Sequence, residues 1–123
     1  MRIGIDILDV ERINHWIGSD KLSKIFTEHE MEYCHSKGWA VETVAGIFCA
    51  KEAFFKALGI GVAISQFPEV EVKHEQRGAP YLRLSSRIVT EHRLSTSKIH
   101  ISISHTRIVA VAVCVIIHFD AFV

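Results

Sequence analysis

The sequence has no excess of charge of either sign and no apolar segment long enough to cross a membrane. Lysine and arginine together number 14, aspartate and glutamate together also number 14, and the formal net charge is therefore zero. Nucleic-acid-binding proteins usually carry a concentrated positive face, which this balance does not suggest. The longest apolar run, Ile108 to Ile117, is about half as long as a membrane-spanning helix and is typical of a buried strand. We therefore expect neither nucleic-acid nor membrane partners.

Cysteines are few, and the chain shows no repeat, linker or low-complexity stretch. The three cysteines lie far apart among apolar residues, which is typical of reduced, packed thiols in a cytosolic protein. Arg2 and Asp6 interrupt any apolar segment of the kind that a secretory signal needs, so we expect a cytoplasmic location. The chain has 123 residues, 49% of them hydrophobic, which predicts one domain over residues 1–123. A domain of this size can bury a core, yet it is near the size at which oligomerisation helps.

One long apolar helix, expected over residues 41–58, carries three charged side chains in its second half. Most of its positions are apolar or small, which indicates a helix packed on most sides, where an unpaired charge is strongly disfavoured. Lys51, Glu52 and Lys56 should therefore share one open stripe or cleft. Gly59 follows and has the backbone freedom for a left-handed helix C-cap. A carboxylate flanked by two ammonium groups beside this turn could hold a divalent cation and the phosphates that the cation bridges.

The same charged residues also have a simpler interpretation. Glu52 and Lys56 are four residues apart and are therefore neighbours on one face of the helix. Such a pair can do no more than support the helix, by roughly 0.2–0.5 kcal/mol. From these residues alone, both interpretations stay open.

Two alternating segments place further polar side chains on strands. In residues 2–8, three isoleucines share one face and Asp6 lies on the other, so Asp6 is a carboxylate projecting from a largely buried strand. Residues 99–105 alternate again, and the strand pattern ends at His105. Ser104 and His105 do not suggest a hydrolase dyad, because adjacent strand residues point to opposite faces.

The remaining patterns predict an α+β domain in which a mainly antiparallel sheet packs against one long helix. Asp9 can cap a helix that ends near Gly18. Thr27 and Glu30 have the form of a capping box, which would open a helix ending near Gly38. The other expected elements are a hairpin with arms at 70–72 and 81–84, a short helix over 86–93, and two final strands at 99–104 and 108–117.

Taken in order, several of these segments resemble the holo-[acyl-carrier-protein] synthases, the short bacterial type of 4'-phosphopantetheinyl transferase. No single piece would suffice, but their joint order and spacing over residues 4 to 106 is specific, and the whole chain has the length usual in that family. The residues that carry the resemblance are Gly4-Ile5-Asp6-Ile7 with Glu11-Arg12-Ile13, Phe26-Thr27 with Glu30, Ala45-Gly46, Lys51-Glu52-Ala53, Lys56-Ala57-Leu58-Gly59 with Gly61, Gly78 with Pro80, and Ser102-Ile103-Ser104-His105-Thr106.

The resemblance implies transfer of the phosphopantetheine arm of coenzyme A to a serine of an apo acyl carrier protein, with release of adenosine 3',5'-bisphosphate. It implies Asp6 and Glu52 as ligands of Mg²⁺, or of Mn²⁺. Lys56 matches a position associated with the diphosphate and the leaving group, so Glu52 and Lys56 are the candidate catalytic residues. The attacking serine belongs to the partner, and no nucleophile is assigned to this chain. The candidate coenzyme-binding residues are Lys51, Lys56, Gly59 and His105.

The resemblance also implies a homotrimer that binds coenzyme A in clefts between adjacent subunits. The apolar strand at 108–117 is richer in hydrophobic residues than the edge of a small monomer should tolerate, so it should lie between neighbours or at the trimer's centre. Carrier proteins are typically acidic around the modified serine, so the surface that receives them should be locally positive. Arg12, Lys21 and Lys24 are the candidates for that surface.

Some positions depart from the family pattern. Position 47 is usually an arginine that helps hold a phosphate of coenzyme A, and here it is Ile47. Loss of a guanidinium removes charge-assisted hydrogen bonds, so coenzyme binding should be weaker unless another cation substitutes. Ile60 replaces a threonine, and Ala79 replaces a lysine. An alternative is therefore a coenzyme A- or carrier-binding homologue with weak or lost catalysis, and a purely structural, oligomer-forming domain is a more distant one.

Overall fold

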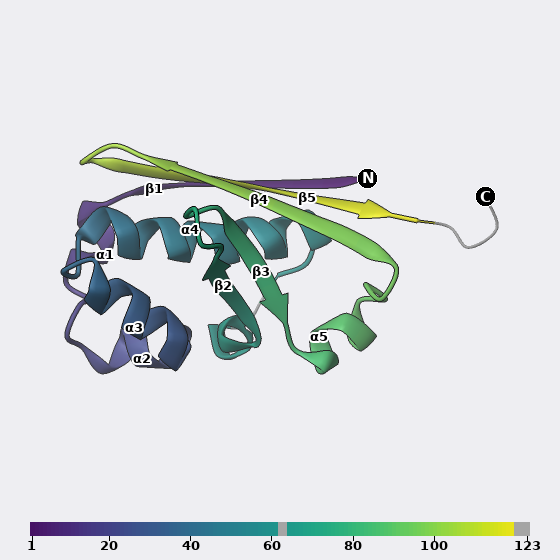
Figure 1. Ribbon diagram of the computed structural model, residues 1–123, viewed down its shortest axis with the longest axis horizontal. Helices are drawn as coiled ribbons and strands as arrows, with labels where there is room; N and C mark the ends of the chain where they lie inside the picture. The colour runs from purple at the N-terminus through teal and green to yellow at the C-terminus, as the bar shows by residue number, and fades with distance from the viewer. Residues whose placement is uncertain (62–63, 120–123) are drawn as a thin grey trace.

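A computed structural model describes residues 1–61 and 64–119, and in it a three-stranded antiparallel sheet lies along one side of a long helix (Figure 1). The sheet has the strand order β1-β5-β4, and β2 and β3 form a separate hairpin. This arrangement confirms the predicted α+β class. The strands are β1 (Arg2–Asp9), β2 (Val70–His74), β3 (Pro80–Leu84), β4 (Ser97–His105) and β5 (Val109–His118). The helices are α1 (Glu11–Asn14), α2 (Asp20–Ile25), α3 (Glu28–Ser36), α4 (Val41–Leu58), the 3₁₀ helix η1 (Ile64–Glu69) and α5 (Ser86–Glu91).

Helix α4 is the centre of the core, as its apolar sequence predicts. The sheet covers one side of it, and α2 and α3 lie on the other (Figure 1). The β2–β3 hairpin passes beside the helix, where β2 contacts α4 and β3 contacts β4. The helix ends at Leu58 because Gly59 adopts a left-handed conformation, with φ of 71°, and its N–H bonds to the carbonyl of Lys56. Within the described part of the chain, no helix combines the length and the apolar character needed to cross a bilayer.

Strand β1 packs directly against α4, and a glycine makes this close approach possible. A Cβ atom at Gly4 would clash with the backbone of Ala53 and Ala57, so no other residue fits there without moving the strand. Two residues earlier, Arg2 Nη1 donates a hydrogen bond to the carbonyl of Leu58 at 2.7 Å. These contacts fix the position of β1 along the helix, and Asp6 consequently lies beside the last two turns of α4.

The three-stranded sheet has one face on α4 and one face in solvent. Strand β5 is the central strand, so the apolar run at 108–117 is not an edge of this sheet. Its even-numbered residues from 110 to 116 are buried against α4, whereas its odd-numbered valines lie on the open face. Ile3, Ile5 and Ile7 share this open face and pair in register with Val115, Val113 and Val111. We call these six residues the outer apolar face.

The predictions for the short helices between β1 and α4 are confirmed for α3 and wrong for the segment before it. The capping box is confirmed: Thr27 Oγ1 accepts a hydrogen bond from the N–H of Glu30, whose carboxylate accepts one from the N–H of Thr27. The helix expected to start at Asp9 is wrong, because Asp9 is the last residue of β1 and α1 is a single turn without a side-chain cap. Helix α2 was not predicted. Each of these helices is too short to show a helical repeat of apolar residues.

Candidate active site

Asp6 of β1, together with Glu52 and Lys56 of α4, forms a polar site on the otherwise apolar contact between strand and helix. Lys56 Nζ donates a hydrogen bond to Asp6 Oδ1 at 3.0 Å. The side chain of Lys56 is 53% exposed and that of Asp6 is 12% exposed. Glu52 precedes Lys56 by one helical turn and lines the same cavity as Asp6. Two carboxylates and one ammonium group from distant parts of the chain therefore meet at one place.

The electrostatic environment of these groups reflects their proximity. The pKa of Glu52 is raised, first because the residue is half-buried and then because of the negative charge of Asp6, while Lys56 opposes the shift. The pKa of Lys56 is also raised, chiefly because its ammonium donates the hydrogen bond to Asp6. The site thus holds more negative than positive charge, and this excess favours binding of a further cation.

A cavity of about 390 Å³ opens over the two carboxylates. Its opposite wall comes from the segment that includes α1 and the start of α2, which contributes Arg12, His15, Trp16 and Lys21. The ammonium of Lys21 lies 4.5 Å from the ring centre of Trp16, so a cation–π contact helps to order this wall. The cavity therefore has an acidic floor and a basic wall, which suits a ligand with both a metal-bound and a free anionic part.

The donor set at the floor of this cavity fits a magnesium ion. Magnesium prefers oxygen ligands and is commonly held by one or two carboxylates, with water and substrate phosphates filling its other positions. Asp6 and Glu52 are the residues that would hold it. Within residues 1–61 and 64–119, no group of three or more His, Cys, Asp or Glu side chains could form a complete protein cage for a metal. A site of this kind would thus need ligands from the substrate.

The prediction that Lys51 shares an open stripe with Glu52 and Lys56 was wrong. Its side chain is fully buried, and its ammonium lies 2.6 Å from Glu30 Oε1. The other two N–H donors bond to backbone carbonyls of Ile25 and Phe67 at 3.1 and 2.9 Å. Successive helical residues point roughly 100° apart, so Lys51 and Glu52 face different surroundings. Lys51 has no donor left for a coenzyme, and we do not assign it to the coenzyme site.

His105 lies at the end of β4, away from the two carboxylates. It lines a second cavity of about 180 Å³ together with Gly46 and Ile47 of α4, His74 of β2 and Tyr33 of α3. Ile47 is only 2% exposed, so its apolar side chain forms part of the floor of this cavity. Gly59 lines neither this cavity nor the one over Asp6 and Glu52. The predicted site residues are thus divided: Asp6, Glu52 and Lys56 form the acidic site, His105 lines a distinct pocket, and Lys51 and Gly59 belong to neither.

The sequence reasoning missed two features of the site. Glu30 was recognised only as a capping residue, whereas its other oxygen accepts a hydrogen bond from Val72 N–H at 2.7 Å, and the first pairs with Lys51. The sequence did contain one indication of this partner. Lys51 is a charged residue on a helix predicted to be buried, and a buried charge requires a partner of opposite charge. The contribution of His15 and Trp16 to the cavity wall had no recognisable signal, because the segment around them has no regular repeat.

Comparison with known proteins identifies the family of the chain. Residues 2–114 match the model of the 4'-phosphopantetheinyl transferase superfamily. A relative from Halothermothrix orenii, named holo-[acyl-carrier-protein] synthase, is 41% identical over 116 residues, which cover 89% of this chain and 91% of the relative.

Solved structures agree in fold. A holo-(acyl-carrier-protein) synthase from Bacillus anthracis, in complex with CoA (3',5'-ADP), superposes with a TM-score of 0.78 at 35% identity, over 96% of each chain. The holo-[acyl-carrier-protein] synthase of Helicobacter pylori, in complex with coenzyme A, gives a TM-score of 0.79 at 28% identity, over 93% of this chain and 98% of that one. The match extends over nearly the whole length of each protein.

Proposed function

The chain belongs to the 4'-phosphopantetheinyl transferase superfamily, and on this premise we propose that it is a holo-[acyl-carrier-protein] synthase. It transfers the 4'-phosphopantetheine group of coenzyme A to a serine of an apo acyl carrier protein and releases adenosine 3',5'-bisphosphate. The observation that carries this proposal is that Asp6 and Glu52 line one cavity and that Lys56 bonds to Asp6, in a chain closely similar to proteins of that name.

The reaction needs an aligned hydroxyl, an acceptor for its proton and stabilisation of charge on the phosphates. The serine oxygen forms a new bond to the phosphorus that carries the pantetheine arm, and the bond from this phosphorus to the bridging oxygen breaks. The electron pair leaves with adenosine 3',5'-bisphosphate. A magnesium ion held by Asp6 and Glu52 would supply charge neutralisation on the diphosphate.

The chain's own side chains have separate tasks in this scheme. The side chain of Lys56 is more than half exposed, and its hydrogen bond to Asp6 leaves further N–H donors for a phosphate oxygen. Because its raised pKa keeps it charged, it can stabilise the charge that grows on the leaving diphosphate. Glu52 lines the cavity beside Asp6 and would serve as the second carboxylate ligand of the metal ion. Gly59 and His105 are assigned to coenzyme binding on the family pattern.

The chain acts as a homotrimer with coenzyme sites between neighbouring subunits, in line with the family pattern. Support comes from the outer apolar face, on which Ile3, Ile5 and Ile7 are each more than half exposed. Exposed apolar patches of this kind mark interaction surfaces. Sedimentation at active concentrations tests the assembly, and Ile5→Lys should dissociate it. A monomer that transfers at the full rate would contradict shared sites.

A second candidate function is a coenzyme- or carrier-binding homologue with weak catalysis. The observation in its favour is Ile47, whose buried apolar side chain occupies the wall of the His105 pocket where the family usually has an arginine. Without the guanidinium, a phosphate in that pocket lacks a charge-assisted partner from α4. The two candidates differ in one measurable quantity, which is the amount of modified carrier formed.

The experiment is incubation of the purified protein with Mg²⁺, coenzyme A and an apo acyl carrier protein, followed by mass spectrometry of the carrier. The proposal expects the mass of one phosphopantetheine group to be added. Asp9→Ala provides a matched control for variants at Asp6, because it removes an exposed carboxylate from the same strand without touching the acidic site. Binding of coenzyme A without modification of any carrier would favour the second candidate.

A further inference from the structure

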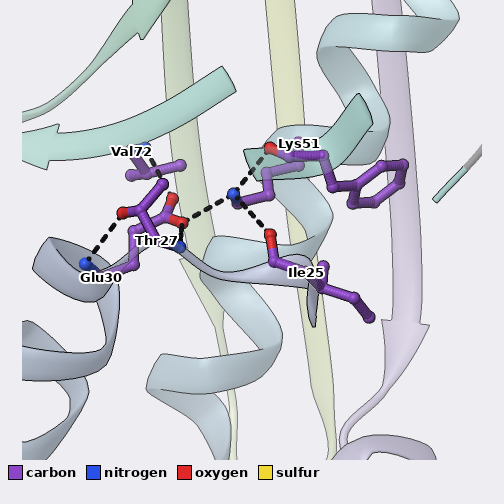
Figure 2. A network of polar contacts seen from close by, with 6 residues as sticks. Ile25, Thr27, Glu30, Lys51 and Val72 are labelled. Atoms are coloured by element: carbon purple, nitrogen blue, oxygen red, sulfur yellow. Dashed lines mark hydrogen bonds and ion pairs between the residues drawn. The ribbon is translucent and has the colours of Figure 1, made fainter. Parts of the chain in front are cut away.

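Lys51 and Glu30 form an ion pair that is completely enclosed by protein. Both side chains have no exposed surface, and every hydrogen-bonding group of the ammonium is used: it contacts Glu30 Oε1 and the carbonyls of Ile25 and Phe67. The carboxylate is equally well satisfied, because it also accepts from the N–H groups of Thr27 and Val72 (Figure 2). Nothing in this network is left for a ligand, so the pair does not form a binding site.

Stability alone is a weak reason for such a pair. Desolvation of two charges can cost as much as their attraction returns, and well-packed apolar replacements are often equally stable. The ring of Phe26 lies 5.5 Å from Lys51 Nζ, so apolar neighbours are already at hand. Beyond stability, the pair determines the arrangement of the chain, because each hydrogen bond fixes the position of a particular backbone segment relative to α4.

The segments that the pair joins include the acidic floor and the basic wall of the cavity. Lys51 directly precedes Glu52 on α4, so anchoring Lys51 fixes the rotation of the helix that aims Glu52 toward Asp6. Ile25 is the last residue of α2, and its carbonyl accepts from the same ammonium. The opposite wall of the cavity belongs to the segment that ends at this residue. A single ammonium group thus holds the floor and the wall in a fixed relation.

We infer that Lys51 and Glu30 are positioning residues, which set the separation between the acidic floor and the basic wall of the cavity and thereby set the rate of transfer and the recognition of the carrier. The inference rests on the proposed function. Both side chains act through Glu52 and through the wall that carries Arg12 and Lys21, and neither touches a substrate. Small misplacements of reacting groups reduce rates strongly, and a shift of about 1 Å can cost 10²-fold.

The decisive variant removes both charges at once. Lys51→Met alone leaves a buried carboxylate without its partner, so it should lower the melting temperature strongly. The double variant Glu30→Gln/Lys51→Met should recover part of that loss, because no unpaired charge stays buried, although the glutamine amide can accept from only one of the N–H groups of Thr27 and Val72. We expect its kcat/KM for the carrier to fall by about 10- to 100-fold, with the Kd for coenzyme A changed much less.

A control separates positioning from simple loss of stability. Ile88→Ala removes a fully buried side chain from α5, which lines neither wall of the cavity, so it should lower the melting temperature without changing kcat or KM. Amide hydrogen exchange provides a readout independent of activity: exchange in residues 11–25 should accelerate in the double variant and not in Ile88→Ala.

The outcomes are distinct. A double variant with wild-type kinetic constants and wild-type exchange in residues 11–25 would overturn the inference and leave the pair a purely structural one. If the double variant does not fold, Glu30→Gln alone decides by the same two readouts, and failure of both to fold would show that the pair is required for folding and overturn the positioning role. If the wild-type chain transfers nothing, the proposed function fails, while hydrogen exchange still tests whether the pair orders the wall.

Discussion

Helix α4 contributes one lysine to each of two carboxylate–lysine pairs, and the two pairs lie in opposite environments. Lys51 and Glu30 are fully buried and 2.6 Å apart, whereas Lys56 and Asp6 are 3.0 Å apart and the lysine side chain is more than half exposed. Burial lowers the pKa of Lys51 despite the attraction of Glu30. The hydrogen bond to Asp6 instead raises the pKa of Lys56. The same two functional groups therefore have opposite shifts, according to how much water reaches them.

A structural pair and a functional pair differ in how many of their hydrogen-bonding groups the protein itself uses. All three donors of Lys51 are used within the protein, and removing any partner strands a buried polar group. Lys56 bonds to one partner and is otherwise open, so a ligand can take its remaining donors. A charged group is available for chemistry when its own fold leaves part of its hydrogen-bonding capacity unused.

Removal of an acid from the open site should have the largest effect on activity. We expect Asp6→Ala or Glu52→Ala to reduce transfer by more than about 100-fold, because loss of a direct metal ligand should exceed the roughly 10- to 100-fold cost of losing a group that only supports one. The fold should survive, since each change relieves repulsion between the two carboxylates. Transfer of phosphopantetheine to the carrier, followed by mass spectrometry, measures the loss.

The metal requirement is the companion test. Wild-type activity should vanish with a chelator and return with added Mg²⁺ or Mn²⁺. Asp9→Ala, on the same strand, should behave like the wild type in both respects. Undiminished turnover in chelator, or a normal rate for Glu52→Ala, would refute the assignment of Asp6 and Glu52 as metal ligands.

Exchanging either lysine for alanine should separate the two pairs directly. Lys56→Ala should lower turnover by about 10²–10³-fold, because its ammonium stabilises charge in the transition state, and should leave the urea midpoint almost unchanged. Lys51→Ala should reduce turnover less, yet lower the free energy of unfolding by roughly 3–5 kcal/mol, because it strands Glu30 in the interior. If the two variants lose stability equally, the contrast between the pairs is wrong.

The fold was largely predictable because its main elements have regular patterns. Helix α4 was predicted over the same residues that it occupies, since its apolar positions and the glycine that follows specify both its packing and its end. The strands were located by alternation, and the capping box fixed the start of α3. The helix expected between Asp9 and Gly18 is only the single turn of α1, and the short α2 was not predicted, because a helix of one or two turns contains too few residues to reveal a period.

The site was predictable only in part. Asp6, Glu52 and Lys56 were selected by a family pattern, and only the glycine contact of β1 with α4 explains why they meet. Lys51 was misplaced because charge was weighed above geometry: at 3.6 residues per turn, Lys51 and Lys56 point roughly 140° apart and cannot share a narrow stripe. Its partner, Glu30, lies on another helix, and the spacing of residues within one helix cannot reveal contacts between two.

Ile47→Arg adds a third cation to α4 and tests whether this cation behaves like the buried Lys51 or like the exposed Lys56. Ile47 forms part of the wall of the His105 pocket, so an arginine there faces the pocket and should strengthen coenzyme A binding by about 10-fold, the value of a modest charge-assisted hydrogen bond. Calorimetric titration with coenzyme A measures the gain. Ile47→Met, which keeps the size without the charge, is the control. A large fall in melting temperature without tighter binding would show that the added guanidinium is buried unpaired, like half of a broken Lys51–Glu30 pair.

The smallest expected effect concerns the basic wall that faces the open pair. Arg12 lines the acidic cavity from α1, where an acidic carrier protein would approach. We expect Arg12→Glu to raise the KM for the carrier several-fold and to leave the KM for coenzyme A nearly unchanged, because exposed charges act mainly on encounter. The wild-type KM for the carrier should rise with salt, since ions screen such attraction over about 10 Å at 0.1 M. Arg77→Glu makes the same charge change in the loop between β2 and β3, outside this cavity, and should leave both constants unaltered. A carrier KM that does not change with salt, or one that rises equally in both variants, would show that the basic wall does not bind the carrier. The pair of Lys56 and Asp6 would then act on coenzyme A alone.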